Sequence, residues 1–284
     1  MSQGNVLITG VSTGIGYFAA QKFVREGYQV YGSVRRQADA DRLVEDFGVN
    51  FHPLIFDVTD EGAIHATADL LMSTIGGEGL QLLVNNSGLA ITGPVQCLST
   101  DEFRQQFEVN FFGLIAVTNA FLPLLGARDK CPHAPGKIIN ISSVASSSGM
   151  PFMTPYGSSK AAVDALSEGL RRELMIYGID VIVFNPGPIK TPIWDKIVEP
   201  NALVRQTVYG KSLMIFHKLS LKQAEGAMPV ERFVEKLFKA FRKKKYKTFE
   251  VIMRKKFLRY TMARMLVSDR SLDKILYKVL KMKP

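Results

Sequence analysis

Short apolar runs alternate with longer amphipathic segments along the first 250 residues of the chain. The short runs are rich in Val, Ile, Leu and Phe and predict strands, whereas apolar positions spaced three to four residues apart predict helices. We expect helices at residues 14–25, 38–47, 61–75, 156–177 and 230–242, with two more between residues 100 and 125. The expected strands are residues 6–9, 29–34, 51–56, 82–84, 137–142, 181–184 and 249–252.

Alternating strands and helices are typical of a parallel sheet that helices cover on both faces. We therefore predict an α/β fold with a doubly wound parallel sheet of about seven strands. Residues 1–253 are expected to form one domain, because no linker-like stretch divides the chain before about residue 190. Such sheets bind ligands beyond the carboxyl ends of their strands, so residues that follow strands are the first candidates for a site.

The composition of the 284-residue chain is typical of a cytoplasmic protein without a metal. Cys97 and Cys131 are isolated, which favours a reducing compartment over a disulfide framework. No basic segment followed by an apolar one begins the chain, so we expect no secretory signal. The four histidines lack metal-ligand spacing. Polar residues interrupt the apolar stretch 107–126, which favours a buried or subunit-contacting helix over a membrane span.

The formal net charge of +10 is concentrated in the last part of the chain. Residues 231–284 contain 18 Lys and Arg against 5 Asp and Glu, whereas residues 1–230 carry a net charge of −3. We expect residues 254–284 to form a basic helical extension, with a helix near residues 254–267 that could contact an anionic membrane surface. The alternative is a solvated helix that closes a pocket or contacts a second subunit. No nucleic acid is expected, because no DNA- or RNA-binding module accompanies the charge.

A glycine-rich turn follows the first predicted strand and precedes the first predicted helix. It reads Thr-Gly-Val-Ser-Thr-Gly-Ile-Gly over residues 9–16. Residues without a Cβ permit a tight turn and close packing of helix against strand, and the helix N-terminus offers unpaired N–H groups to a phosphate. The spacing is Gly-x-x-x-Gly-x-Gly and differs from Gly-x-Gly-x-x-Gly, but the position after the first strand favours a pyrophosphate site in a Rossmann-like sheet.

Tyr156 and Lys160 lie one turn apart on a predicted helix and share one of its faces. An ammonium group beside a phenol favours the phenolate and lowers its pKa from about 10. Ser143 precedes the tyrosine by thirteen residues and could hold the oxygen of a ketone or alcohol. A Tyr-x-x-x-Lys pair alone is more often a solvated pair on a helix surface, so its interpretation depends on the rest of the chain.

Taken together and in this order, these motifs resemble the short-chain dehydrogenase/reductase family. Three further segments carry the resemblance, which covers about residues 4–195 and is greatest for the subgroup that contains retinol and hydroxysteroid dehydrogenases. They are Asn85-Asn86-Ser87-Gly88, where the family usually has Asn-Asn-Ala-Gly, the pair Val109-Asn110, and Asn185-Pro186-Gly187-Pro188-Ile189-Lys190-Thr191.

The resemblance implies hydride transfer between a nicotinamide cofactor and an alcohol/carbonyl pair. Tyr156 is then the acid for reduction and the base for oxidation, and Lys160 lowers its pKa and binds the nicotinamide ribose. Ser143 polarises the carbonyl oxygen, and Asn110 holds a water that links Lys160 to solvent. The implied cofactor-binding residues are Gly10, Ser12, Thr13, Gly14, Ile15, Gly16, Arg35, Arg36, Asp57, Val58, Asn86, Ser87, Gly88, Tyr156, Lys160, Pro186, Gly187, Ile189 and Thr191.

The residues after the second predicted strand favour NADP(H) over NAD(H). NAD-selective members of the family usually place an acidic residue at the position that is Val34 here. Arg35 and Arg36 follow it, and a guanidinium group is well suited to a 2′-phosphate. The alternative is that these arginines are solvated at a strand end and that the cofactor is NAD(H).

Residues 191–228 occupy the substrate loop of the family and are rich in apolar side chains, as are Met150, Phe152 and Met153. We expect a pocket for an apolar, lipid-, steroid- or retinoid-like alcohol, ketone or aldehyde; packing against the core or a partner subunit is the alternative. A homodimer or homotetramer is expected. Two other functions stay open, namely an NAD-linked dehydrogenase of a small hydroxy compound and a catalytically quiet cofactor-binding sensor or scaffold.

Overall fold

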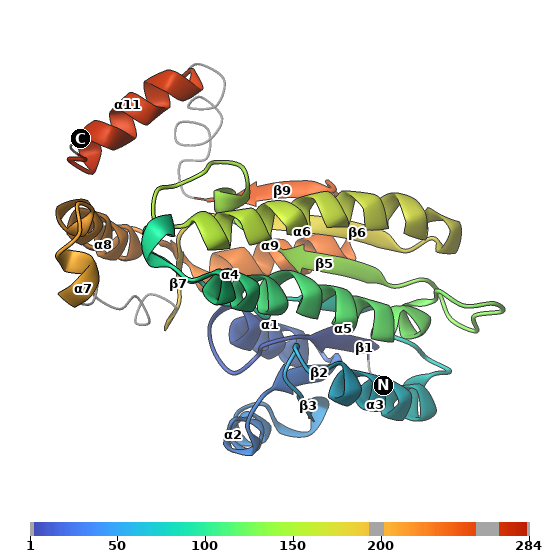
Figure 1. Cartoon of the computed structure of the whole chain (residues 1–284). Coiled ribbons are helices and arrows are strands. Elements are labelled where there is room, and N and C mark those ends of the chain that lie inside the picture. Colours follow the sequence, from blue (N-terminus) through green and yellow to red (C-terminus); the bar gives the residue numbers. More distant parts are fainter. Residues whose placement is uncertain (1–2, 193–201, 254–266, 283–284) are drawn as a thin grey trace.

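A seven-stranded parallel sheet forms the centre of the computed structural model, which describes residues 3–192, 202–253 and 267–282 (Figure 1). The strand order is β3-β2-β1-β4-β5-β6-β9, and every neighbouring pair is parallel. The predicted doubly wound α/β sheet is therefore confirmed. The strands are β1 (Asn5–Ile8), β2 (Gln29–Val34), β3 (Phe51–Ile55), β4 (Leu82–Asn85), β5 (Lys137–Ile141), β6 (Asp180–Pro186) and β9 (Phe249–Ile252).

Helices pack on both faces of the sheet because successive strand residues point to opposite sides. Val6 and Ile8 of β1 face one apolar cluster, and Leu7 between them faces the other. Burial of each such side chain stabilises the fold by about 1.5–3 kcal/mol. The first face carries α1 (Gly14–Arg25), α2 (Gln37–Phe47) and α9 (Val230–Arg242), and the second carries α3 (Glu61–Ile75), α5 (Gly113–Phe121) and α6 (Thr154–Glu173).

The helical stretch between residues 100 and 125 is continuous, although two helices were expected there. It consists of α4 (Thr100–Phe107), a π-helical turn (Glu108–Phe112), α5 and a 3₁₀ turn (Leu122–Leu125). Ser99 and Glu102 begin it with a capping box, which satisfies the first backbone N–H groups. Within the described residues this stretch is the one helix long and apolar enough to cross a membrane, and 44% of its most apolar window is buried inside the protein.

The segment after β6 contains elements that the sequence pattern does not reveal. β7 (Ile189–Lys190) pairs with β8 (Met228–Pro229), and between them lie α7 (Ala202–Arg205) and α8 (Gly210–Glu225). Near the C-terminus, α11 (Asp269–Val279) lies above α8 in Figure 1, and Leu280 just after it packs with Phe152 and Leu213. The helix expected near residues 254–267 lies outside the described residues, apart from Val267.

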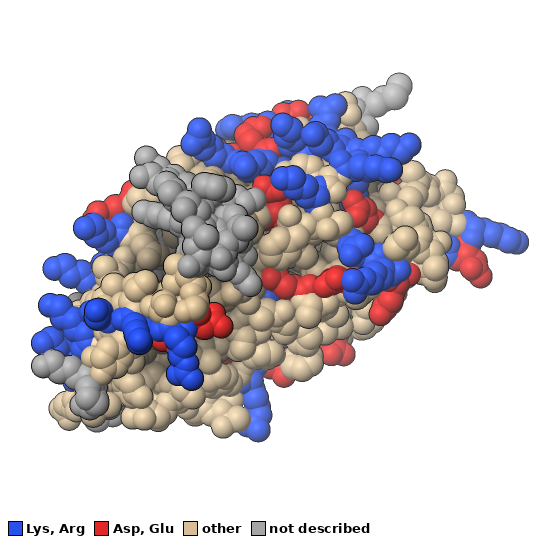
Figure 2. Space-filling view, turned by 90° about the horizontal axis from the view of Figure 1, so that it is seen from above, with Lys and Arg blue, Asp and Glu red and all other residues tan. Residues whose placement is uncertain are grey.

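Basic side chains are dense on parts of the surface, as Figure 2 shows for the face seen from above. The outer side of α9 and the turn after it contribute many of them, because the apolar side of α9 is buried against α1 and the sheet. The exposed basic residues of this region are Arg232, Lys236, Lys239, Arg242, Lys243, Lys244, Lys245 and Lys247.

Candidate active site

The glycine-rich turn joins β1 to α1 at the point where the strand order of the sheet reverses, between β1 and β4. Gly10 and Gly14 have φ values of +68° and +64°, which side chains with a Cβ rarely adopt. A Cβ added to Gly16 would lie 2.3 Å from the Gly10 carbonyl oxygen. Thr13 precedes α1 and makes no side-chain cap, so N–H groups of the first helical turn remain available to an anion. These features fit the pyrophosphate of a dinucleotide.

Asn86 and Ser87 hold this turn from the neighbouring strand, β4. The backbone N–H groups of both residues donate to Thr9 Oγ1, at 2.9 and 3.0 Å. The Asn86 side-chain amide donates to the carbonyls of Thr9 and Gly10 at 2.9 and 3.1 Å. The predicted residues Asn86 and Ser87 therefore brace the turn.

Arg35 and Arg36 lie beyond the end of β2, beside the glycine-rich turn. Both side chains are more than three-quarters exposed. Arg35 Nη1 lies 3.7 Å from Asp57 Oδ2, and Arg36 Nε donates to Asp39 at 2.9 Å. Asp57 also accepts two hydrogen bonds from Thr59. The arrangement leaves the Arg35 guanidinium accessible to a phosphate beside the carboxylate of Asp57.

Asn110 lies in the π-helical turn and is 1% exposed. Its Oδ1 accepts from Leu89 N–H at 2.9 Å, and its Nδ2 donates to Leu89 O and Ser159 Oγ at 3.1 Å each. A Cβ added to Gly88 would lie 3.1 Å from Asn110 Oδ1 and 3.7 Å from Lys160 Nζ. The widened turn thus places Asn110 against α6 and the segment after β4, as π-helical turns often do at functional sites.

The Ser143 hydroxyl and the Tyr156 phenol lie near enough for the serine to influence the pKa of the tyrosine. Ser143 follows β5 and its Oγ also accepts from Ala145 N–H at 3.2 Å, which fixes the hydroxyl at the start of a 3₁₀ turn. Burial raises the pKa of the Tyr156 phenol, and the interaction with Ser143 opposes that shift. The direction differs from the lowering expected from the sequence, because desolvation of the phenolate outweighs the favourable contact. The phenol is therefore a proton donor at neutral pH.

Lys160 lies one helical turn after Tyr156 and is only 5% exposed. Its Nζ donates to the Ile141 carbonyl at 2.8 Å and lies 6.0 Å from the centre of the Tyr156 ring. Burial lowers the pKa of Lys160 to about 8, and the nearby carboxylate of Asp164 opposes that shift. Lys160 thus carries a proton at neutral pH and can lose it in moderately alkaline solution.

The remaining predicted cofactor residues occupy several parts of the same end of the sheet. Pro186 ends β6, Gly187 N–H donates to Ile252 O at 2.9 Å, and Ile189 lies in β7. A Cβ added to Gly14 would lie 3.5 Å from Thr191 Cβ, so this loop reaches the glycine-rich turn. Val58 packs under the start of α5, where a Cβ added to Gly113 would clash with it, and Ile15 packs against the core.

Sequence reasoning missed a hydrogen-bonded pair next to Ser143, namely Asn185 and Asp164. The buried Asn185 amide donates to Ser143 O and Ser146 Oγ at 2.9 Å each, and to Asp164 Oδ2 at 3.0 Å. The sequence marks Asn185 only as part of the motif after β6, and Asp164 lies on α6 one turn after Lys160. The helical spacing from Lys160 to Asp164 was the available signal for the second residue.

A cavity of about 560 Å³ lies next to the segment that joins Ser143 to Tyr156. Met150, Met153 and Ser146 line one side, and Leu276 and Tyr277 of α11 line the other. Phe152 does not line it, because its ring packs against Tyr209 and Phe216 in the cluster that also holds Leu213 and Leu280. Some of the apolar residues expected in a pocket thus form core, and Ile193, Trp194, Ile197 and Val198 lie outside the described residues.

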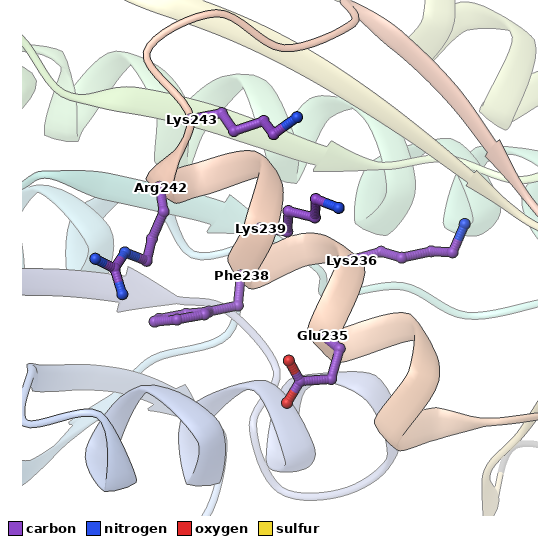
Figure 3. A pocket seen from close by; sticks show the side chains of 6 residues that line it. All are labelled: Glu235, Lys236, Phe238, Lys239, Arg242 and Lys243. Atoms are coloured by element: carbon purple, nitrogen blue, oxygen red, sulfur yellow. The ribbon is translucent and has the colours of Figure 1, made fainter.

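A second hollow, of about 420 Å³, lies on α9 (Figure 3). It contains none of the predicted site residues. Figure 3 shows Lys236, Lys239 and Lys243 extending from one side of the helix and Phe238 and Glu235 from another. Arg242 and Lys22 lie over the Phe238 ring, 5.9 and 5.1 Å from its centre. Among the residues that the structure describes, no group of three His, Cys, Asp or Glu side chains could hold a metal ion.

Comparison with known proteins gives consistent matches over most of the chain. Residues 4–202 match the family described as short chain dehydrogenase. The NADPH-dependent 3-dehydrocapnine reductase of Ornithobacterium rhinotracheale is 42% identical over 275 residues, which are 97% of this chain and 96% of the relative. Two solved structures share the fold. A short-chain dehydrogenase from Streptomyces avermitilis has a TM-score of 0.77, 24% identity and coverage of 100% of this chain and 99% of its own. The closed form of a serine dehydrogenase complexed with NADP⁺ has a TM-score of 0.72, 25% identity and coverage of 88% and 94%.

Proposed function

The chain belongs to the short-chain dehydrogenase family and is an NAD(P)-dependent oxidoreductase, and we propose that it reduces a ketone with NADPH, using Tyr156 as the proton donor. One observation carries the proposal. The segment Asn86 to Gly88 touches the glycine-rich turn on one side and Asn110 and Lys160 on the other. The nucleotide-binding features and the proton-donating features therefore share one end of the sheet.

Each residue of the site has a separate role in the proposed reduction. The Ser143 hydroxyl, which lies near Tyr156, polarises the carbonyl oxygen of the substrate, and the Tyr156 phenol protonates that oxygen as negative charge develops. Lys160 holds a positive charge beside the tyrosine and stabilises its phenolate after transfer. Asn110, fixed by Leu89 and Ser159, keeps the segment beside Lys160 in place for proton return from solvent. The glycine-rich turn and Arg35 would hold NADPH, which would supply the hydride for this reduction.

Replacement of Tyr156 by Phe tests this function directly. The variant keeps the ring and loses the donor, so we expect kcat for NADPH-dependent ketone reduction to fall by about 10²–10⁴-fold with NADPH affinity nearly unchanged. Absorbance of NADPH measures turnover, and its fluorescence measures binding. Tyr177→Phe is the matched control, because Tyr177 is exposed and follows α6. Near-normal turnover of the Tyr156 variant would refute the proposed role.

NADP(H) is the favoured cofactor, on the strength of Arg35 and Arg36 after β2 and of the NADPH- and NADP⁺-binding relatives. Charge-assisted hydrogen bonds to a phosphate contribute about 1.5–3 kcal/mol. We therefore expect Arg35→Asp to weaken NADPH binding by more than about tenfold and to leave NADH binding nearly unchanged. Titration calorimetry with both nucleotides measures the difference, with Arg232→Asp on α9 as the control. Equal losses for both nucleotides would argue against a contact with the 2′-phosphate.

We further propose that the substrate is an apolar, lipid-like ketone, of which a 3-dehydro compound like that in the relative's name is one example. The cavity beside the Ser143–Tyr156 segment supports this, because methionines and α11 residues form its walls. A retinoid or steroid stays an alternative. A panel of ketones of increasing chain length, assayed with NADPH and then NADH, would identify the class; activity confined to small hydroxy compounds with NAD⁺ would contradict it.

For the assembled protein, we propose a cytoplasmic homodimer or homotetramer whose basic extension, residues 254–284, contacts anionic membranes. Support comes from the charge of residues 231–284 and from α11, which exposes Ile275 and Val279 near Lys274 and Lys278. Light scattering would give the oligomeric state. Co-sedimentation with phosphatidylserine vesicles, with phosphatidylcholine vesicles as control, would test the membrane contact; equal recovery with both, or with a chain ending at Met253, would exclude it.

A further inference from the structure

Arg42 is a charged side chain of α2 that contacts the glycine-rich turn, although it is far from that turn in the sequence. Its Nη2 donates to the Ser12 carbonyl oxygen at 2.8 Å. Its Nη1 lies 3.2 Å from Asp46 Oδ2, and Nη2 lies 3.7 Å from Asp39 Oδ1. The guanidinium also lies over the Tyr17 ring of α1, 5.8 Å from its centre. One side chain thus joins the turn to both helices that follow it.

These contacts hold the guanidinium in one place even though the side chain is 43% exposed. Asp39 and Asp46 lie three residues before and four residues after Arg42, on the same side of α2. The Tyr17 hydroxyl donates to Asp46 Oδ2 at 3.2 Å, which orients the second carboxylate as well. Since the planar guanidinium keeps its donors in a fixed fork, ordering it costs less per hydrogen bond than ordering a lysine would.

The turn is fixed on its other side by β2. Gly10 N–H donates to Ser33 Oγ at 3.1 Å, and Val11 N–H donates to Ser33 O at 3.0 Å. The peptide between Ser12 and Thr13 comes next, and its carbonyl points to Arg42. Because a trans peptide directs its C=O and N–H in opposite directions, the Arg42 bond turns the Thr13 N–H away from α2. That N–H lies directly before the N-terminus of α1, where an anion would bind.

We propose that Arg42 is a positioning residue for the cofactor: it fixes the Ser12–Thr13 peptide so that the glycine-rich turn presents its N–H groups to the pyrophosphate. The inference rests on the proposed binding of a dinucleotide at this turn. Since NADPH and NADH share the pyrophosphate, Arg42 should influence the affinity for both nucleotides. Arg35, which is proposed to contact the 2′-phosphate, should influence the affinity for NADPH alone.

The test compares Arg42→Ala, Arg42→Lys and the control Arg104→Ala, whose arginine is exposed on α4 and pairs with Asp101. Dissociation constants for NADPH and NADH are measured by fluorescence titration of the purified full chain. In the alanine variant, nucleotide binding must itself fix the Ser12–Thr13 peptide, and a cost comparable to one charge-assisted hydrogen bond predicts about tenfold weaker binding of both nucleotides. The lysine variant should recover part of the loss, and the control should bind as the wild type does. At saturating NADPH, kcat of the alanine variant should equal that of the wild type, and its midpoint of thermal unfolding without nucleotide should be nearly unchanged.

Each other outcome has a distinct meaning. Unchanged affinity for both nucleotides in Arg42→Ala would overturn the inference, as would a loss confined to NADPH, which would make Arg42 a direct phosphate contact. An equal loss that accompanies a large drop in thermal stability would reduce Arg42 to a structural residue. If the wild-type chain binds neither nucleotide, the proposed function itself fails, so the two failures are distinguishable.

Discussion

Lys160 gives the site a pH dependence at the scale of a single residue. Its burial lowers its pKa to about 8, whereas burial raises the pKa of Tyr156, so the phenol keeps its proton when the lysine loses its own. Loss of the ammonium removes the charge that stabilises the phenolate after proton transfer. We therefore expect kcat/KM for NADPH-dependent reduction to be level near neutral pH and to fall as the pH rises through about 8.

A pH–rate profile of the wild type and of Lys160→Arg measures this effect. Arginine stays charged throughout, so any activity left in the variant should lack the fall near pH 8. A wild-type rate that stays level to pH 10 would contradict the proposed role of the Lys160 charge.

The free energy of unfolding changes in the opposite direction to the rate. The folded-state pKa of Lys160 lies below the ordinary value of 10.5, so the unfolded chain binds more protons between about pH 8 and 10.5. Loss of the Lys160 proton therefore favours the folded state across that window.

The residues proposed to react are easier to predict from sequence than those proposed to position them. Tyr156 and Lys160 share a helical spacing that is weak evidence alone, and the other motifs with their resemblance to a known family identified them together with Ser143. Asn185 and Arg42 act through hydrogen bonds to backbone carbonyls, and such contacts depend on how distant segments meet. The raised pKa of Tyr156 was also beyond the sequence, because burial of a side chain is set by the whole fold.

At the scale of elements, Lys137 joins a strand to the end of a helix. It begins β5, and its Nζ donates to the carbonyls of Phe241 and Lys243 at the end of α9, the first at 2.8 Å. A cation at a helix C-terminus satisfies carbonyls that lack partners within the helix and interacts favourably with the helix dipole. Lys137→Met keeps most of the side-chain volume and should lower the free energy of unfolding by about 1–2 kcal/mol.

Urea unfolding followed by circular dichroism would measure that loss. Lys236→Met is the matched control, because Lys236 is exposed on the same helix, and it should change stability by less than about 0.5 kcal/mol. Equal stability of both variants would show that water replaces the lysine at the end of α9.

The main helices and strands could be predicted from the periodicity of apolar residues. The strands β7 and β8 could not, because they have two residues each and pair across nearly 40 positions, which leaves no periodic signal in the sequence.

At the scale of the whole molecule, the C-terminal residues lie against the segment between Ser143 and Tyr156. Leu280 is 2% exposed and packs with Phe152 and Leu213, while α11 itself has no fully buried residue. Phe152 has a φ of +69°, a strained value for a bulky residue, and it lies between Ser143 and Tyr156. Leu280 therefore contacts the segment that joins Ser143 to Tyr156.

Leu280→Ala should release α11 without unfolding the rest of the chain. Truncating a buried leucine costs about 2–5 kcal/mol, and that cost falls on the contact that holds a terminal helix rather than on the sheet. We expect faster amide hydrogen exchange in residues 269–279 and in residues 144–153, and a higher KM for apolar ketones whose chains reach α11. Val279→Ala, next to it and 49% exposed, is the control and should change neither. A Leu280 variant with wild-type exchange in residues 144–153 would contradict this expectation. It would show that α11 covers the cavity lined by Met150 and Leu276 without stabilising residues 144–153.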